Sequence, residues 1–116
     1  MIQKEALKKA ISSLKKSKKT NVLTGAGISV ESGIAPFRGK DGLWEKYDPY
    51  EYAHLDSFNN NATKSWIMLR EMGKQIFNAK PNIAHYSLTK LQKRGKIDTI
   101  ITQNVDNLHQ DRKSVV

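Results

Sequence analysis

Two short apolar runs, each followed at once by a motif of small or polar residues, constrain the fold more than any other feature of this chain. Residues 22–24 lead into Gly25–Gly27, and residues 97–102 lead into a polar run at 103–107. Both runs are rich in β-branched residues, which predicts buried strands. The long stretch between them allows a helical crossover, so the sequence predicts a parallel strand pair in an α/β sheet. Ligands of such sheets bind outside the carboxyl ends of the strands, where both motifs would lie.

Most of the connecting sequence is predicted to be helical. Residues 50–80 carry apolar side chains at helical spacing, most clearly at Trp66, Leu69, Met72 and Ile76. Residues 83–93 predict a further helix, which Gly95 is expected to end. Residues 33–49 differ, because they hold three glycines, two prolines and three aromatic residues. This composition predicts a long functional loop rather than a regular element.

The net charge of +9 is concentrated near the N-terminus. Residues 1–19 predict a basic amphipathic helix with Leu7, Ile11 and Leu14 on one face, and residues 4–19 hold seven lysines and one acid. Such an excess attracts nucleic acid weakly and in a salt-dependent way. Because no recognition motif accompanies it, a solvated helix face is favoured and specific nucleic-acid binding is not expected.

The composition excludes several classes of protein and site. At 116 residues the chain is one domain or a piece of one. It has no cysteine, which removes disulfides, Cys-ligated zinc and thiol nucleophiles, and its three histidines are too far apart in sequence for a metal motif. No apolar run approaches the roughly 20 residues of a membrane span. The N-terminus also lacks the apolar centre of a secretory signal, so a cytoplasmic location is expected.

The first candidate site is Gly25–Gly27, which stands between a strand and a short helix predicted at 28–32. Glycines at such a turn let a pyrophosphate approach the backbone, while the helix N-terminus supplies free N–H groups. The full dinucleotide fingerprint would have a third glycine where Val30 stands. The motif taken alone is therefore also compatible with an ordinary structural turn.

The second and third candidate sites flank the predicted sheet edge. Phe37 could cover a bound ring and Arg38 could pair with a phosphate, although both could equally be ordinary structural residues. The amides of Gln103 and Asn104 can bind ribose hydroxyls or a carboxamide, and Asp106 can accept from an amide, although an Asx turn is the alternative. His109 is expected to be a packed, hydrogen-bonded residue rather than a general base.

These motifs, in this order, resemble those of the sirtuins, the NAD-dependent protein deacylases of the silent-information-regulator-2 type. The resemblance runs from about residue 21 to residue 110. The matching segments are Gly25–Ser29, Ser32–Ile34, Phe37–Gly39, Gly42–Trp44, Pro81–Asn82, Ala84–His85, Thr102–Asp106 and Leu108–Gln110.

The resemblance implies a fold and a reaction. The expected fold is part of a Rossmann-type, doubly wound parallel sheet with helices, and residues 1–116 would be the N-terminal part of the catalytic domain. Such enzymes bind NAD between this sheet and a small zinc module. They cleave NAD to nicotinamide and O-acyl-ADP-ribose while removing an acyl group from a lysine. The expected partner is thus an acylated-lysine protein or peptide.

The resemblance also implies roles for individual residues. The turn beginning at Gly25 would bind NAD, with contacts from Ala26, Gly27 and Ser29. Phe37 would shield the exposed ribose face, and Arg38 would stabilise the bound cofactor. Gln103 and Asn104 would touch the nicotinamide ribose, and Asp106 the carboxamide. Breaking the glycosidic bond builds positive charge on the ribose, so a water-excluding, electrostatically arranged pocket is the expected device.

The chain also departs from the family pattern. The general-base histidine of a His-Gly motif would follow the position of Gln110, and no His-Gly occurs here. The four zinc-binding cysteines are absent, and residues 111–116 do not follow the usual continuation, which suggests a truncation or a shifted reading frame. Zinc is expected in full-length sirtuins but has no ligands here, and this chain is expected to be inactive alone.

Substrate preference and alternative functions also follow from the sequence. Sirtuins that prefer acidic acyl groups carry a Tyr-x-x-Arg pair. At the aligned positions this chain has Trp66 and Leu69, and Arg70 follows one residue after the position of the arginine. The resemblance therefore favours neutral acyl groups. A non-catalytic module that binds NAD or ADP-ribose is the first alternative to a deacylase. A basic nucleic-acid interaction protein is the second.

Overall fold

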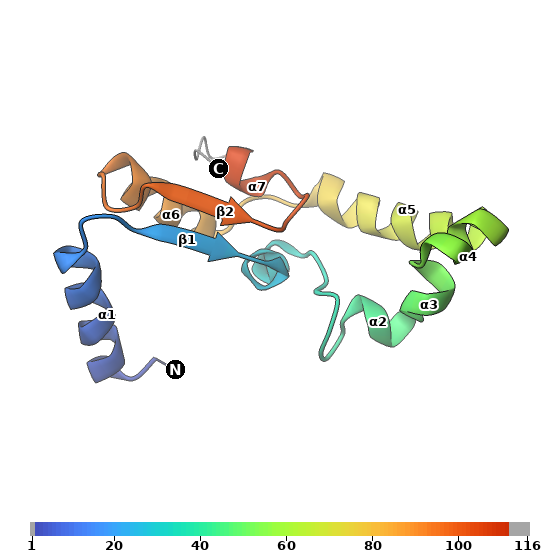
Figure 1. Ribbon diagram of the computed structural model, residues 1–116, viewed down its shortest axis with the longest axis horizontal. Helices are drawn as coiled ribbons and strands as arrows, with labels where there is room; N and C mark the ends of the chain where they lie inside the picture. The colour runs from blue at the N-terminus through green and yellow to red at the C-terminus, as the bar shows by residue number, and fades with distance from the viewer. Residues whose placement is uncertain (1, 112–116) are drawn as a thin grey trace.

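The computed structural model describes residues 2–111 as a two-stranded parallel sheet at one end of the molecule and a group of helices at the other (Figure 1). The helices and strands in chain order are α1 (Lys4–Lys16), β1 (Asn21–Thr24), the 3₁₀ helix η1 (Ala26–Ser32), α2 (Leu43–Lys46), α3 (Pro49–Tyr52), α4 (Leu55–Asn60), α5 (Ala62–Asn78), α6 (Ile83–Lys93), β2 (Thr99–Thr102) and α7 (Leu108–Asp111). The molecule measures 53 × 29 × 24 Å. Its radius of gyration of 17.4 Å exceeds the about 13 Å of a compact domain of this length, so it is elongated.

The two strands pair in parallel, as the sequence predicts. Asn21 lies opposite Thr99, and the register continues to Thr24 opposite Thr102. At the amino edge, the backbone N–H of Thr20 donates to Asp98 Oδ2 at 2.8 Å, which fixes where the pairing begins. Because the strands are equally long, they end level with each other. The motifs that follow them therefore begin at the same edge of the sheet.

Helix α6 has the bounds that its end signals predict. Asn82 accepts a hydrogen bond from the Ala84 backbone N–H, and His85 completes a capping box by accepting from the Asn82 backbone N–H. Gly95 follows the helix with a φ of 71°, a left-handed conformation that favours glycine. Local capping thus marks both ends of this helix.

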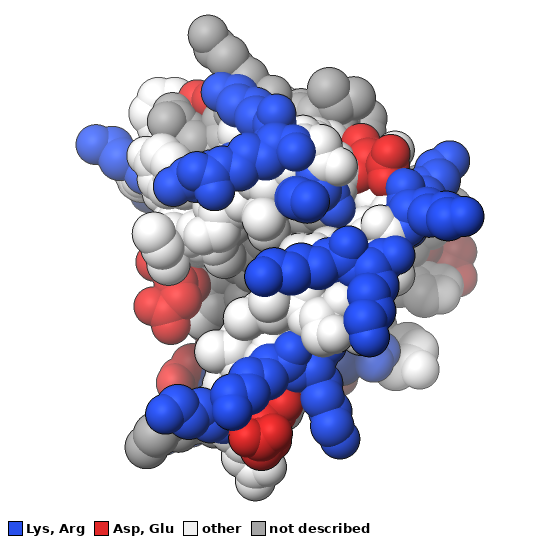
Figure 2. Space-filling view, turned by 90° about the vertical axis from the view of Figure 1, so that its left-hand side faces the viewer, with Lys and Arg blue, Asp and Glu red and all other residues white. Residues whose placement is uncertain are grey.

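Basic side chains gather at the amino edge of the sheet. Figure 2 shows Lys and Arg spread over the end of the molecule that carries α1 and the start of both strands. The segment 15–19 precedes β1 and the segment 90–96 precedes β2, and their lysines and Arg94 are exposed. The charge excess therefore lies at the end of the strands opposite the motifs at their carboxyl ends.

None of the helices in residues 2–111 combines the length and apolar character needed to span a bilayer.

The buried side chains form two groups. At the helical end, Leu43, Tyr47 and Met68 form a cluster that Trp44, Tyr52 and Met72 cover. At the sheet end, the buried residues are Ile97, Ile100, Leu108, His85 and His109. Helix α1 contributes no buried residue to either group. The candidate site lies between the two groups.

Two expectations from the sequence need correction. The segment 33–49 is not a continuous loop, because α2 forms inside it where Leu43 is buried and its backbone N–H donates to Pro36 O at 2.7 Å. The buried face of α5 is also displaced by one residue from the predicted one. Trp66 and Leu69 are exposed, whereas Ser65 and Met68 are buried, and Met68 packs in the cluster with Leu43 and Tyr47.

Gly42 provides a test of the turn that precedes α2. A Cβ added there would lie 2.8 Å from the Arg38 carbonyl carbon and 2.8 Å from Gly39 O, so Gly42→Ala should force the turn open. We expect a loss of about 1–3 kcal/mol in the free energy of unfolding, measured by urea denaturation. Gly73→Ala is the matched control, because a Cβ in this part of α5 meets no described atom within 4 Å. It should stabilise the helix by about 0.5–1 kcal/mol, and equal effects of the two changes would contradict this account.

Candidate functional site

The carboxyl ends of the two strands are joined by direct hydrogen bonds. The Thr24 hydroxyl donates to Thr102 Oγ1 at 2.8 Å, and Asn104 Nδ2 donates to Gly25 O at 2.9 Å. The Asn104 backbone N–H also donates to Thr102 Oγ1 at 3.1 Å. Motifs that are almost eighty residues apart in sequence thus form a single surface, as the parallel register requires.

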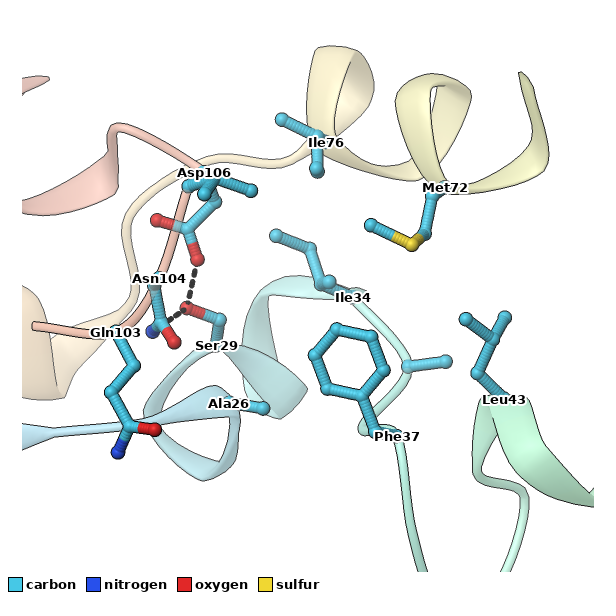
Figure 3. A pocket seen from close by; sticks show the side chains of 12 residues that line it. Ala26, Ser29, Ile34, Phe37, Leu43, Met72, Ile76, Gln103, Asn104 and Asp106 are labelled. Atoms are coloured by element: carbon cyan, nitrogen blue, oxygen red, sulfur yellow. Dashed lines mark hydrogen bonds between the residues drawn. The ribbon is translucent and has the colours of Figure 1, made fainter. Parts of the chain in front are cut away.

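Ser29 and Asp106 hold the loop after β2 against η1. The Ser29 hydroxyl donates to Asp106 Oδ2 at 2.6 Å, and Asn104 Nδ2 lies 3.4 Å from Ser29 Oγ (Figure 3). The other carboxylate oxygen, Oδ1, accepts from the Leu108 backbone N–H at 3.0 Å. Ser29 is 1% exposed and Asp106 is 9% exposed. A buried carboxylate with two fixed donors makes this wall of the site rigid.

A cleft runs along this joined edge. Its inner part is a cavity of about 120 Å³ that Ser29 and Asp106 line, and its outer part is an open groove of about 560 Å³ that Gly25 and Arg38 line. The two parts are continuous, because they share the lining residues Ala26, Phe37, Gln103 and Asn104. The cleft therefore offers polar groups along its length and a more enclosed inner end.

The wall opposite the polar residues is apolar. Phe37 points into the inner cavity, where Ile34, Met72 and Ile76 also point (Figure 3). The Phe37 ring lies 5.4 Å from that of Trp44 and remains 45% exposed, so it is not a core residue. Sequence reasoning proposed no role for Ile34, Met72 and Ile76 in the site. The helical spacing of Met72 and Ile76 showed that they share a face but not what that face covers.

The short helix predicted after the glycine turn is present and begins two residues earlier than predicted. Residues 26–32 form a 3₁₀ helix, and Gly25 is its N-cap residue. In such a helix the first N–H groups have no acceptor within the helix, so Ala26 and Gly27 keep backbone donors, while a helix this short adds little dipole. Ala26 lines both parts of the cleft, whereas Gly27 is exposed beside it.

Asn82 supports the site from outside the cleft, and sequence reasoning gave it no role. Its Nδ2 donates to Ile28 O at 2.7 Å and to Ser32 Oγ at 3.0 Å, while its Oδ1 caps α6. It therefore fixes η1 to the first turn of α6. An asparagine before a helical run is a sequence signal for the cap of α6. The contact of Asn82 with η1 has no such signal, because it depends on the tertiary structure.

His109 is packed and hydrogen-bonded, as expected. It is 1% exposed, and its Nε2 lies 2.9 Å from Thr24 Oγ1. Its ring centroid lies 5.0 Å from that of His85, which is fully buried on α6. Burial lowers the pKa of both rings. Both are therefore neutral near pH 7 and lie behind the cleft rather than in it.

The residues present do not fit a zinc site. The chain contains no cysteine, and residues 2–111 hold no group of three histidine or acidic side chains close enough to share a metal ion.

Comparison with known proteins identifies the family. The sequence model of the Sir2 family matches residues 25–114. The chain is 49% identical over 106 residues to NAD-dependent protein deacylase 2 of Archaeoglobus fulgidus, which covers 91% of this chain and 42% of that protein.

Solved structures agree with the sequence comparison. A structure described under the mechanism and regulation of Sir2 enzymes superposes with a TM-score of 0.89 at 46% identity, over 97% of this chain and 44% of that one. A Sir2 variant with a deacetylated p53 peptide and 3′-O-acetyl ADP ribose gives a TM-score of 0.86 at 40% identity, over 93% of this chain and 44% of that one.

The chain spans less than half the length of these relatives. The match nevertheless includes the glycine turn, the loop with Phe37 and Arg38, and the polar run after β2. The fold is accordingly α/β and Rossmann-like, as predicted from the sequence. This chain belongs to the Sir2 family, the sirtuins.

Proposed function

We propose that this chain forms the dinucleotide-binding part of an NAD-dependent protein-lysine deacylase. The observation that carries the proposal is the continuous cleft along the joined strand ends, with backbone N–H groups and Arg38 on its outer part and a buried carboxylate on its inner part. These groups suit the pyrophosphate and the carboxamide of NAD, respectively. Relatives that share this sequence are NAD-dependent deacylases by name, which supports the same cosubstrate here.

The outer groove would hold the pyrophosphate. The N–H groups of Ala26 and Gly27 would donate to its oxygens, and Arg38 would add a charged pair. Gln103, whose side chain lies at the boundary of both parts of the cleft, would bind a ribose hydroxyl together with Asn104. The cosubstrate would thus be oriented along the strand ends.

The inner cavity would receive the nicotinamide. Asp106 Oδ1 and Oδ2 each accept one hydrogen bond within the protein, and a carboxylate oxygen can accept a second, so Asp106 could still bind a carboxamide NH₂. Phe37 and Ile34 would exclude water from the ribose. Cleavage of the glycosidic bond develops positive charge there, and a fixed carboxylate in a dry pocket stabilises that charge better than water does.

The acyl group is proposed to be neutral. A second hollow adjoins Phe37 and is lined by Trp44, Phe58 and Leu69, and no lysine or arginine occurs among the described residues that line it. An acidic acyl group would lose its hydration there without gaining a cation. The substrate would be an acylated lysine in a protein or peptide, in keeping with the peptide found on a Sir2 relative. Specific nucleic-acid binding is not part of this proposal.

Two experiments separate a complete enzyme from a binding module. Calorimetry with NAD and with ADP-ribose measures binding by the 116-residue chain. Release of nicotinamide in the presence of an acetyl-lysine peptide measures turnover. We expect binding without turnover, because both buried histidines lie outside the cleft and no His-Gly motif is present. A chain that binds neither ligand would refute the dinucleotide site, whereas nicotinamide release would refute its inactivity.

Arg38 tests the outer groove. Arg38→Ala should weaken ADP-ribose binding by about 10-fold, because it removes a charged hydrogen bond to phosphate. Lys40→Ala is the control, since Lys40 is an exposed cation of the same loop that does not line the groove. It should change the dissociation constant by less than about 2-fold, as screened surface charges do. An equal loss in both variants would reduce the role of Arg38 to general charge.

A further inference from the structure

Two buried imidazoles meet behind the strand ends, outside the cleft. His85 on α6 is 0% exposed and His109 on α7 is 1% exposed. Their ring centroids are 5.0 Å apart, with 59° between the ring planes. Each ring has one nitrogen bonded within the protein and one buried nitrogen with no hydrogen-bond partner among residues 2–111. Buried nitrogens are rarely left in this state, so the second nitrogens call for an explanation.

The hydrogen bonds of His85 fix its tautomer. Its Nδ1 accepts from the Asn82 backbone N–H at 3.2 Å, so Nδ1 carries no proton. A neutral imidazole holds its single proton on the other nitrogen. His85 Nε2 is therefore an N–H donor, and it is this donor that lacks a partner in the described part of the chain.

The hydrogen bonds of His109 fix the complementary state. Thr24 Oγ1 lies 2.9 Å from His109 Nε2 and donates its only proton to Thr102 Oγ1. His109 Nε2 must therefore donate to Thr24, which leaves Nδ1 without a proton. His109 Nδ1 is an acceptor, again without a partner within residues 2–111.

We propose that His85 Nε2–H and His109 Nδ1 form a donor–acceptor pair bridged by one buried water, and that this pair positions η1 and the strand ends that border the cleft. One water between an unpaired donor and an unpaired acceptor on adjacent rings satisfies both, which removes two buried orphan groups at once. The two rings are positioning residues, since neither lines the cleft.

The pair connects η1 and the strand ends through short chains of hydrogen bonds. From His109 the chain runs through Thr24 and Thr102 to the Asn104 backbone N–H, which belongs to the polar wall. From His85 it runs through Asn82, whose Nδ2 holds η1 at Ile28 O and thus the glycine turn. The pair therefore supports, from behind the cleft, the spacing between the glycine turn and Asn104 that the Asn104–Gly25 hydrogen bond sets directly.

The pairing requires both rings to be neutral. The negative charge of Asp106 acts to raise the pKa of both rings, because it stabilises their protonated forms. Burial nevertheless lowers the pKa of both rings, and the neighbouring His109 lowers the pKa of His85 further. A proton on His109 Nδ1 would remove the acceptor and leave two N–H donors facing the same water. Histidine in an unfolded chain has a pKa of about 6.5, which is higher than the pKa of either ring in the folded protein. Below that pH the unfolded state therefore binds more protons than the folded state. The free energy of unfolding consequently decreases as the pH falls from about 6.5 toward the folded pKa values.

Histidine-selective ¹⁵N NMR of the 116-residue chain tests the pair without any ligand. The chain has three histidines, and the exposed His54 provides a reference signal. We expect His85 and His109 both as the Nε2–H tautomer near pH 7. An Nδ1–H signal from His109, or random-coil signals from both rings, would overturn the proposal.

Two substitutions at His85 separate the pair from the helix cap. Asparagine places an acceptor near the Nδ1 position, and glutamine places an amide donor near the Nε2 position. His85→Asn should keep the cap and weaken ADP-ribose binding by about 10-fold, whereas His85→Gln should stay closer to the parent protein. The opposite order would mean that His85 serves only as a cap.

A double variant tests whether the two rings act as one unit. His109→Gln keeps a donor for Thr24 and loses the Nδ1 acceptor. Combined with His85→Asn, it should weaken ADP-ribose binding no more than either change alone, whereas additive losses would exclude a shared interaction. These affinity experiments rest on the proposed function. The NMR experiment does not, so a cleft that fails to bind ADP-ribose would leave the tautomer result standing by itself.

Discussion

Asp106→Ala should lower the free energy of unfolding by about 2–4 kcal/mol and weaken ADP-ribose binding by at least about 100-fold. The carboxylate accepts from the Ser29 hydroxyl and from the Leu108 backbone N–H at a site that is only 9% exposed. Alanine would leave both donors buried without an acceptor. The loop after β2 would then lose its attachment to η1, and the inner cavity would lose its shape. Urea denaturation and calorimetry measure the two losses.

Asp106→Asn is the control that separates charge from geometry. The asparagine Oδ1 can still accept from Leu108, and the Ser29 hydroxyl can turn to accept from the new NH₂ group. Most of the stability should therefore remain, while ADP-ribose or NAD binding reports the contribution of the charge. If Asp106→Ala bound ADP-ribose as well as the parent protein, the inner cavity would not be part of the ligand site.

Ile100→Ala should remove about 2–5 kcal/mol of stability, the largest loss expected from a single apolar truncation in this chain. Ile100 is 0% exposed and lies opposite Val22 in the register of the sheet. Removing its side chain leaves a cavity beneath the strand pair, and the apolar core at the sheet end is small. Because small domains are marginally stable, we expect much of the chain to unfold at 25 °C, visible as a loss of helical circular dichroism.

Ile101→Ala is a control of identical composition one residue away. Ile101 points to the other face of the sheet and is 52% exposed. Its truncation should change stability by about 0.5 kcal/mol. A similar loss in both variants would mean that the face of β2 bearing Ile101 is also covered in solution, for example by association between molecules at the open sheet edge.

Much of the site followed from local sequence. Two β-branched runs separated by a long crossover predicted a parallel pair, and a parallel pair brings the carboxyl ends of its strands to one edge. This reasoning predicts that the glycine turn and the polar run lie at one edge, and the hydrogen bond from Asn104 Nδ2 to Gly25 O joins them there. The bounds of α6 also followed, because residues 83–93 carry a helical pattern and Gly95 marks its end.

Periodicity failed where apolar residues surround a helix. Residues 66–69 of α5 are all apolar, so helical spacing could not choose a buried face, and Met68 is buried instead of Trp66 because it packs with Leu43 and Tyr47. Helix α2 was missed for a related reason. Four residues are too few to show a helical period, and α2 depends on contacts of Leu43.

The sequence by itself determined the strand pair, the edge at which its motifs meet, and the family, since each depends on residue types at fixed spacing. Only the tertiary structure decided which side chains meet across the cleft. Ser29 and Asp106, or His85 and His109, lie far apart in the chain, and their contact depends on how η1, α6 and α7 are placed. A hydrogen bond requires two groups within about 3 Å in the right orientation, and spacing along the chain carries no such information for residues on different elements.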